Sequence, residues 1–225
     1  AMMDWNEVEV RSSNEGSGSK VSNEIYLNFK QGKFKVRLVH KPIFYKQYFI
    51  DPKYSSFEKV LPIIVDPDDD PLADLGHYGG IKCATNVIDR EDGKVKVLRC
   101  GKTVYENFAA YAQETEVAPG SKDGPDFLIK VDDPNGDKRQ RKYKVIPLAP
   151  APFTAEEKAM FKDKAGDSGI HSLEEIFAAK TGDEVKEMIE KFSIQPDDSV
   201  AEKLSEAPSS GESSFSDGED DDIPF

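Results

Sequence analysis

Alternation of apolar and charged residues is the clearest local pattern in the chain and begins at residue 33. Residues 33–38 read KFKVRL, a period of two that places alternate side chains on opposite faces of a β-strand. We therefore expect a strand with one core-facing surface and one basic surface. The apolar set is Phe34, Val36 and Leu38, and the basic set is Lys33, Lys35 and Arg37.

Further strands are expected beyond a break at His40-Lys41-Pro42. Residues 43–50 (IFYKQYFI) are rich in aromatic and β-branched side chains, which favours a second strand. Residues 57–65 could continue the sheet, but Pro62 restricts this segment to an edge strand or a loop.

Two β-hairpins are predicted in the second half of the chain. Residues 81–88 and 94–100 flank the sequence REDG, and residues 126–133 and 139–148 flank PNGD. Asp-Gly and Asn-Gly dipeptides favour the tight turns that join antiparallel strands.

The segment between the hairpins has helical periodicity. Val104, Phe108 and Tyr111 fall on one side of a helix over residues 103–113. Strands, one helix and a closing hairpin form the element order of an OB-fold, a small Greek-key β-barrel with a helix between its third and fourth strands. We therefore expect a mainly β protein with some α structure, whose OB-fold core spans residues 25–152.

The residues outside this core have different patterns. Residues 1–24 lack sustained periodicity and are predicted to be a flexible N-terminal segment. Residues 153–192 contain two or three short helical stretches, with Thr154 and Ser172 as N-caps. From residue 193 onward Ser, Glu, Asp and Pro dominate, so we expect a disordered acidic tail over residues 193–225.

The net charge of −13 is concentrated in the C-terminal third. Residues 1–20 carry 2 basic and 4 acidic side chains, residues 21–152 carry 21 and 19, and residues 153–225 carry 7 and 20. An evenly distributed acidic excess would argue against a nucleic-acid partner. This distribution instead leaves a nearly neutral body that can present a basic face.

Composition also narrows the class of protein. No stretch approaches the roughly 20 apolar residues of a membrane helix, and no charged-then-apolar leader opens the chain. We therefore expect a cytoplasmic protein without membrane association. Two cysteines, Cys83 and Cys100, fit a reducing cytoplasm better than a disulfide scaffold.

Basic and aromatic residues combine on the predicted strands. Alternation places Phe44, Lys46 and Tyr48 on one face, which is a poor core surface but a good platform for stacked bases and phosphates. The closing hairpin adds KRQRKYK at residues 138–144, where OB-folds often grip a strand. The alternative is a solvated strand whose lysines extend over aromatic core residues. The predicted DNA-binding residues are Lys33, Lys35, Arg37, Lys41, Phe44, Tyr45, Lys46, Tyr48, Phe49, Lys94, Lys96, Arg139, Arg141 and Tyr143.

Three stretches are specific enough to suggest a family: NVIDREDGKVKVLRCGKTVYENFAAYA (86–112), DFLIKVDDPNGDKRQRKYKVIPL (126–148) and GKFKVRLVHKP (32–42). Together they resemble the helix-destabilising single-stranded DNA-binding proteins of tailed bacteriophages. The resemblance implies an OB-fold that coats single-stranded DNA in replication, recombination and repair, in the cytoplasm of the infected bacterial host and without catalysis. It also implies a separable acidic C-terminal region that contacts other replication proteins.

The last six residues, DDDIPF, resemble the C-terminal peptide of bacterial single-stranded DNA-binding proteins, which docks its terminal Pro-Phe in a hydrophobic pocket. An aromatic ring beside a free carboxylate and an acidic run suits a pocket with a basic rim. A solubility tail would explain the acidic residues but not the apolar ending. The predicted partner-binding residues are Asp220, Asp221, Asp222, Ile223, Pro224 and Phe225.

Two features depart from the phage family. Its classical members carry a zinc ribbon with three Cys and one His, whereas this chain offers only His77, Cys83 and Cys100, and a structural zinc site needs four ligands. We therefore expect no metal and no other cofactor, with these three residues as weak candidates only. Residues 1–24 also lack the basic arm that promotes cooperative binding in some relatives.

Other functions are less well supported. The acidic residues between Asp66 and Asp74, with His77, could hold a divalent metal in a nuclease-like site, but no positioned base lies nearby and a solvated loop is favoured. Neither a phosphate-binding Gly-rich loop nor a paired nucleophile and base is evident. The main alternative is an OB-fold adaptor that binds only proteins. RNA also remains an alternative to DNA, because both polymers offer bases and phosphates.

Overall fold

The computed structural model describes residues 25–133, 136, 140–161 and 170–197. The fold is a mixed α/β structure built on one seven-stranded antiparallel sheet, in the order β3-β2-β4-β1-β6-β7 with β5 paired to β4. The strands are β1 (Gly32–Leu38), β2 (Ile43–Ile50), β3 (Leu61–Val65), β4 (Gly80–Asp89), β5 (Val95–Cys100), β6 (Pro125–Asp132) and β7 (Lys142–Pro150). The helices are η3 (Pro52–Tyr54), α2 (Pro71–Asp74), α3 (Lys102–Thr115), α4 (Ala155–Met160), α5 (Leu173–Ile176) and α6 (Gly182–Lys191).

The long strand β4 organises the sheet. Along one edge it pairs first with β2 and then with β1, and along its other edge it pairs with β5. Pro42 interrupts the first edge, and Asn86 bridges the interruption because its backbone N–H and its side-chain amide contact His40 Nε2 at 3.3 and 2.9 Å. Strands β1 and β2 therefore follow one another along the same side of β4.

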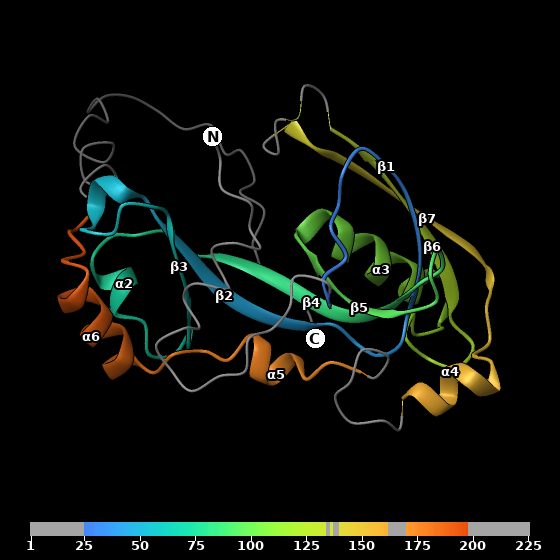
Figure 1. Cartoon of the computed structure of the whole chain (residues 1–225). Coiled ribbons are helices and arrows are strands. Elements are labelled where there is room, and N and C mark those ends of the chain that lie inside the picture. Colours follow the sequence, from blue (N-terminus) through green and yellow to red (C-terminus); the bar gives the residue numbers. More distant parts are fainter. Residues whose placement is uncertain (1–24, 134–135, 137–139, 162–169, 198–225) are drawn as a thin grey trace, which may run out of the picture.

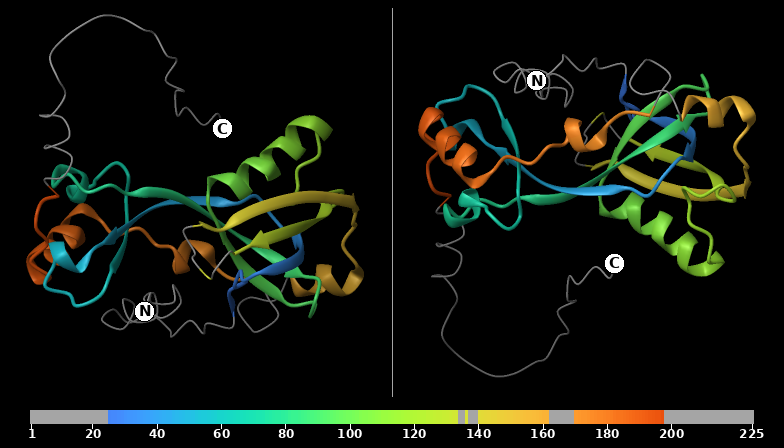
Figure 2. Two further views of the ribbon diagram at one scale, coloured as in Figure 1. Left: turned by 90° about the horizontal axis from the view of Figure 1, so that it is seen from above. Right: turned by 90° about the horizontal axis from the view of Figure 1, so that it is seen from below.

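The molecule is elongated, with a lobe towards each end of β4 (Figures 1 and 2). The main lobe consists of β1, β4, β5, β6, β7 and α3, and its core includes Val36, Phe108 and Phe127. The small lobe consists of the far ends of β2 and β4 with β3, α2 and α6, and its core includes Ile63 and Leu72. Each lobe thus has its own apolar core, and β2 and β4 run between them.

The C-terminal strap, residues 151–161 and 170–197, runs along the molecule and contacts both lobes (Figure 1). Near its start, Glu157 of α4 accepts a hydrogen bond from Arg90 of the main lobe. In its middle, Phe177 stacks on Tyr45 of β2 with ring centroids 4.6 Å apart. At its end, α6 contributes to the core of the small lobe. The predicted helical region 153–192 is therefore packed against the sheet.

Most of the predicted elements form. The helix expected over residues 103–113 is α3, and the two expected hairpins are β4–β5 and β6–β7. Gly93 adopts the left-handed conformation (φ 73°) that its turn requires. Thr154 caps α4 through a reciprocal capping box. The coarse prediction of a mainly antiparallel β fold with short helices is confirmed.

The sheet is not closed into a barrel by backbone pairing. Strands β5 and β7 are the ends of the paired path through the main lobe, and no pairing joins them within the described residues. Pro62 lies in β3, which pairs with β2 over its whole length and with the strap only through a bridge from Val65 to Lys180 among the described residues. It is thus an edge strand of the sheet, where proline is tolerated. No helix in the described part of the chain is long and apolar enough to cross a membrane.

The predicted boundary between the helical region and the acidic tail, at residue 193, lies too early in the chain. Order does not stop at Phe192, because Ile194 is 4% exposed in the small-lobe core. The N–H of Gln195 also donates to the carbonyl of Tyr54 at 2.8 Å. Residues 1–24, predicted to be a flexible segment, and the rest of the predicted tail lie outside the described residues.

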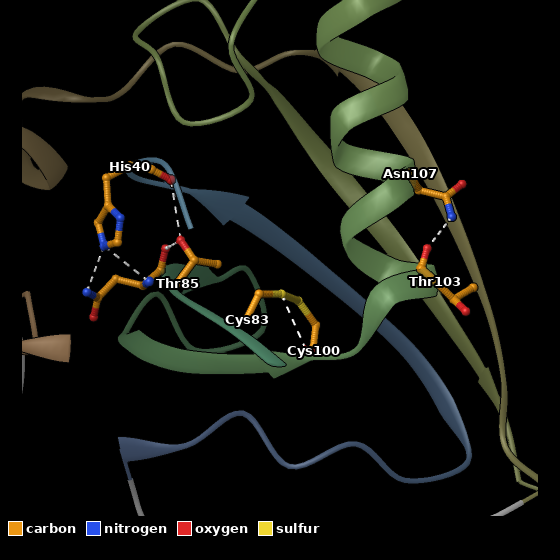
Figure 3. The surroundings of a disulfide bond; sticks show 7 residues. His40, Cys83, Thr85, Cys100, Thr103 and Asn107 are labelled. Atoms are coloured by element: carbon orange, nitrogen blue, oxygen red, sulfur yellow. Dashed lines mark hydrogen bonds between the residues drawn. A yellow bond between two sulfur atoms is a disulfide. The ribbon is translucent and has the colours of Figure 1, made fainter. Parts of the chain in front are cut away.

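The cysteines were expected to be reduced, and this is wrong. Cys83 and Cys100 face each other across the β4–β5 pair and form a disulfide bond (Figure 3). The register of the hairpin places them directly opposite, which sequence spacing alone does not reveal.

The acidic loop before α2 is structural and not merely solvated. Asp70 caps α2 and also accepts hydrogen bonds from Lys46 Nζ at 2.6 Å and from the Tyr48 hydroxyl at 2.7 Å. Asp69 accepts from the backbone N–H of Gly182 at the start of α6, at 2.9 Å. These carboxylates connect the loop to β2 and α6, so the prediction of a solvated loop is wrong for both.

The Asp70 contacts predict a pH-dependent stability. Burial raises the pKa of the Asp70 carboxyl, but the hydrogen bonds from Lys46 and Tyr48 outweigh burial and hold the pKa below its usual value. The stabilisation is therefore complete above about pH 4 and is lost as the pH falls through the folded-state pKa. We expect Asp70→Asn to lower the free energy of unfolding at pH 7 by about 2 to 3 kcal/mol and to flatten its decrease in acid, as measured by urea denaturation.

Asp74→Asn provides the control, because it removes an exposed carboxylate from the same helix. An acid profile of Asp70→Asn that matched the unmodified protein would contradict a stabilising role for the ionised carboxylate.

Candidate functional site

The structure contains a cavity of about 500 Å³ at the start of α3. Five segments line it: residues 27–30 before β1, Tyr45 of β2, Lys82 opposite it on β4, residues 99–104 at the junction of β5 with α3, and Arg141 and Tyr143 at the start of β7. The chain before β1 bridges to β5 through Tyr26 and Val97, and no pairing joins β5 to β7 within the described residues. The cavity therefore lies where the two ends of the main-lobe sheet approach the chain before β1. Its lining residues are Leu27, Asn28, Phe29, Lys30, Tyr45, Lys82, Arg99, Cys100, Gly101, Lys102, Thr103, Val104, Arg141 and Tyr143.

Positive charge dominates the cavity wall. Five of the fourteen described lining residues are Lys or Arg, and none of the fourteen is acidic. Several of these cations have partners of their own. Arg141 pairs with Asp133 at 2.9 Å, the Arg99 guanidinium lies 4.2 Å from the ring centre of Tyr26, and Lys102 lies 3.8 Å from Glu106 in an exposed pair. Exposed pairs at that distance contribute little, so the wall suits an anion.

Aromatic rings provide the apolar part of the wall. Phe29 and Tyr143 lie with their ring centroids 5.6 Å apart, and both are partly buried against the main-lobe core. Tyr45 is 8% exposed because Phe177 of the strap covers one of its faces. The cavity therefore combines ring surfaces with cations.

Helix α3 adds a polar contribution at the same place. Its N-cap is Gly101, which provides no side-chain hydrogen bond to the first turn. The backbone N–H groups at the start of a helix carry partial positive charge. The helix thus increases the positive character of the wall formed by residues 101–104.

A second, exposed surface lies on the α3 side of β2. Phe44 is 42% exposed and meets Tyr105 of α3 edge-on, with ring centroids 4.7 Å apart. Ile81 of β4 is 49% exposed and lies on the same face. It pairs with Lys46, and Lys46 is two residues from Phe44 along β2, so the three side chains share one side of the sheet. Phe44 and Ile81 form what we call the apolar strip.

Arg37 is not part of an exposed basic face, and its prediction as a DNA contact is wrong. Its side chain is fully buried, and its guanidinium lies 4.1 Å from the ring centre of Phe153. The group donates hydrogen bonds of 2.6–2.9 Å to the carbonyl oxygens of Leu38, Pro119, Ser121 and Ala151. Arg37 therefore connects β1 to two distant segments, the loop between α3 and β6 and the chain after β7, and is unavailable to a ligand.

Tyr48 is also misassigned as a stacking residue. It is 1% exposed in the core of the small lobe. Burial and the hydrogen bond to Asp70 raise its pKa to about 12. Lys46, on the same face of β2, is committed to Asp70 as well. The predicted aromatic–Lys–aromatic platform thus retains only Phe44.

Lys96 is bound to carboxylates rather than available to phosphate. It contacts Asp89 at 2.6 Å and Asp92 at 2.8 Å. Burial lowers the pKa of Lys96, but these two carboxylates outweigh burial and raise it.

The other predicted residues fall into three groups. Tyr45, Arg141 and Tyr143 line the cavity. Lys33, Lys35, Lys41, Phe49 and Lys94 are exposed but do not line it, and Lys35 lies 3.6 Å from Asp126. Arg139 and the partner-binding residues Asp220 to Phe225 lie outside the described residues.

Several cavity residues were missed by the sequence analysis. Lys82 was assigned to a strand without a role, and Phe29 and Lys30 precede the first recognised alternation. Arg99 and Lys102 flank a Cys-Gly junction between strand and helix, and that arrangement of cations around a glycine was an available signal. The missed residues are Phe29, Lys30, Lys82, Arg99 and Lys102.

The weak metal candidates do not lie together. Cys83 and Cys100 are bonded to each other in the main lobe, whereas His77 Nε2 contacts the carbonyl of Gln195 at 2.8 Å beside the small lobe. Among the described residues no group of three potential ligands could hold a metal ion.

Comparisons of the chain with protein-family models, with curated proteins and with solved structures find no match. The assignment of function therefore depends on the geometry of the cavity and on the sequence resemblance.

The burial of Tyr48 and the exposure of Phe44 predict losses of stability of very different size for two similar substitutions. Tyr48→Ala should lower the free energy of unfolding by about 3 to 5 kcal/mol, because it empties a core position and removes a partner of Asp70. Phe44→Ala should cost no more than about 1.5 kcal/mol, since it loses mainly one edge-on ring contact. Urea denaturation of both variants tests this, and equal losses would contradict the assignment of the two faces of β2.

Proposed function

We propose that the protein binds single-stranded DNA with little sequence preference and that the cavity at the start of α3 is the centre of its binding site. The observation that carries the proposal is the composition of the cavity wall, with five cations, three aromatic rings and no acidic residue among its described members. Proteins that hold single strands without reading their sequence combine these two elements, a basic groove and stacking rings.

Each part of the wall has a role in this proposal. Lys30, Lys82 and Lys102 attract backbone phosphates, and the start of α3 adds backbone donors that suit the same anions. Tyr143 and Phe29 offer ring surfaces to bases, and every base presents such a face irrespective of sequence. The strand continues over the apolar strip, where an exposed ring and an exposed aliphatic side chain are available to a further base.

The order of pairing supports an OB-fold assignment for the main lobe. The path β5-β4-β1-β6-β7, with α3 between β5 and β6 in the chain, is the arrangement of a five-stranded Greek-key barrel with a helix after its third strand. Such barrels are often partly open, in keeping with the lack of a β5–β7 pairing among the described residues. On this assignment β2, β3 and α2 are an insertion between the first and second strands of the barrel.

The biological setting follows from the sequence resemblance and forms part of the same proposal. The protein coats and protects single-stranded DNA during phage replication, recombination and repair in the infected bacterial cell. Its C-terminal tip, Asp220 to Phe225, docks into partner proteins that have an apolar pocket with a basic rim. No catalytic step is part of this function.

Titration with a fluorescent oligothymidylate tests the proposal against a protein-only adaptor. Log affinity should fall with log salt at a slope of about −0.7 per phosphate neutralised. Lys82→Gln and Lys30→Gln should each weaken binding and reduce this slope by about 0.7, and Tyr143→Leu should weaken binding by about 1 to 3 kcal/mol through lost stacking.

Lys122→Gln serves as the matched control, because Lys122 is exposed and does not line the cavity. Absence of binding at low salt would favour the adaptor. Binding that Lys122→Gln weakened as much as Lys82→Gln would refute the cavity as the site. A parallel titration with oligouridylate distinguishes DNA from RNA.

The distribution of charge predicts that the tail competes with DNA. Residues 198–225 carry 1 basic and 9 acidic side chains, so their removal changes the net charge from −13 to −5. A tethered acidic segment has an effective concentration of about millimolar order near the site. Truncation after Asp197, which keeps the buried Ile194, should therefore raise affinity for oligothymidylate, most strongly at low salt where screening is weakest.

Deletion of Phe225 alone gives the matched comparison, because it removes a ring and leaves the acidic side chains in place. We expect it to leave DNA affinity nearly unchanged. If the truncated and full-length chains bound DNA equally at low salt, competition by the tail would be disproved.

A further inference from the structure

The disulfide bond lies at the edge of the proposed DNA site. Cys100 is the last residue of β5 and lines the cavity, and Cys83 faces it from β4. The two residues are 6% and 2% exposed. Figure 3 shows the bond beside the first turn of α3, where Thr103 lies. A covalent bond thus borders a cavity to which we assign a ligand.

The hairpin does not depend on this bond for its closure. Backbone pairing joins β4 and β5 over six residue pairs, from Cys83 opposite Cys100 to Ile88 opposite Val95, and a tight turn connects them. A cross-link stabilises most when it closes a long, otherwise free loop. The larger effect of this bond is therefore on the chain that follows Cys100.

That chain forms a continuous part of the cavity wall. All six residues from Arg99 to Val104 line the cavity, and they include two of its five cations. Gly101 gives α3 no side-chain cap, so no capping side chain fixes the first turn. The disulfide holds Cys100, in the middle of this wall segment, to the central strand of the sheet.

We infer that the Cys83–Cys100 disulfide is a redox switch for the site, with the oxidised protein binding single-stranded DNA more tightly than the reduced protein. The inference rests on the proposed function. In the switching reaction a small dithiol attacks one sulfur of the bond and forms a mixed disulfide with it, releasing the other cysteine. The second thiol of the reagent then attacks this mixed disulfide, which breaks the bond to the protein and closes the reagent's own disulfide. The protein has then gained two electrons and two protons and carries two thiols.

The direction of the effect follows from where the sulfur atoms can move. Two thiols cannot remain at bonding distance, so one side chain must shift. Both cysteines belong to the main-lobe core, but of the two only Cys100 also lines the cavity, so it has space into which it can move. Movement of Cys100 into that space disturbs the wall from Arg99 to Val104, and DNA must then reorder it on binding. Loss of a preorganised wall lowers affinity.

The experiment compares the full chain in two redox states. Fluorescent oligothymidylate is titrated into protein oxidised with oxidised dithiothreitol and into protein reduced with dithiothreitol. We expect reduction to weaken binding at least about fivefold, the lower end of typical coupling between sites. By reciprocity, saturating oligothymidylate should make the disulfide harder to reduce by the same factor. Thiol alkylation and mass spectrometry across a dithiothreitol redox series measure that shift.

The double variant Cys83→Ser, Cys100→Ser is the matched control. It should bind like the reduced protein and should not respond to dithiothreitol, and a response would show that the effect has another origin. Because reduced unmodified protein is measured as well, the test does not depend on the variant folding.

Two outcomes separate this inference from the proposed function. Equal affinity of the oxidised and reduced proteins would overturn the switch and leave DNA binding intact. Absence of binding in both states would overturn the proposed function and the switch together. Two alkylatable thiols that remained even after treatment with a stronger oxidant, oxidised glutathione in excess, would also overturn the switch, because the bond would then not form.

Discussion

Backbone pairing along β4 is the constraint on which the rest of the structure depends. This strand of ten residues extends from one lobe to the other. It is paired with β1, β2 and β5, and no other described strand has three paired neighbours. Its register sets Tyr45 opposite Lys82 in the cavity wall and Cys83 opposite Cys100 at the cavity edge. A shift of one residue would turn each of these side chains to the other face of the sheet.

Ion pairing decides which cations are available to a ligand. Lys46 and Lys96 are held by carboxylates within 3 Å, and Arg90 is bound to Asp126 and Glu157. These contacts satisfy buried charge, which is costly when left unpaired. Binding to phosphate would require breaking them. Lys46, Lys96 and Arg90 are therefore left out of the proposed site, which is defined by the cations that line the cavity.

Apolar packing and carboxylate contacts hold the small lobe together. Strands β2 and β3 with helices α2 and α6 supply its core, and Asp69 and Asp70 connect the acidic loop to α6 and β2. Lys180 of the strap exchanges backbone hydrogen bonds with Ile64 and Asp66 beside β3. The C-terminal strap is thus a structural part of the small lobe, and truncations within it would remove core residues.

Local chemistry in the sequence determined the strands, the hairpin turns, α3 and the capped start of α4. Alternation and turn residues act between near neighbours in the chain, so these elements could be recognised without a fold. The members of the candidate site were harder to predict, because the exposure of a side chain depends on distant segments. Arg37 was assigned correctly to the face opposite Val36, but the carbonyl of Ala151, 114 residues away, helps to bury it.

Only the tertiary structure decided which residues form the candidate site. Five segments separated in the sequence meet at the cavity, and nothing in the spacing of Lys30, Lys82 and Tyr143 indicates that they share one wall. The disulfide likewise depends on hairpin register rather than on the distance between its cysteines in the chain. Periodicity determines which face of a strand a side chain occupies, whereas packing of remote segments determines whether that face is covered, paired or open.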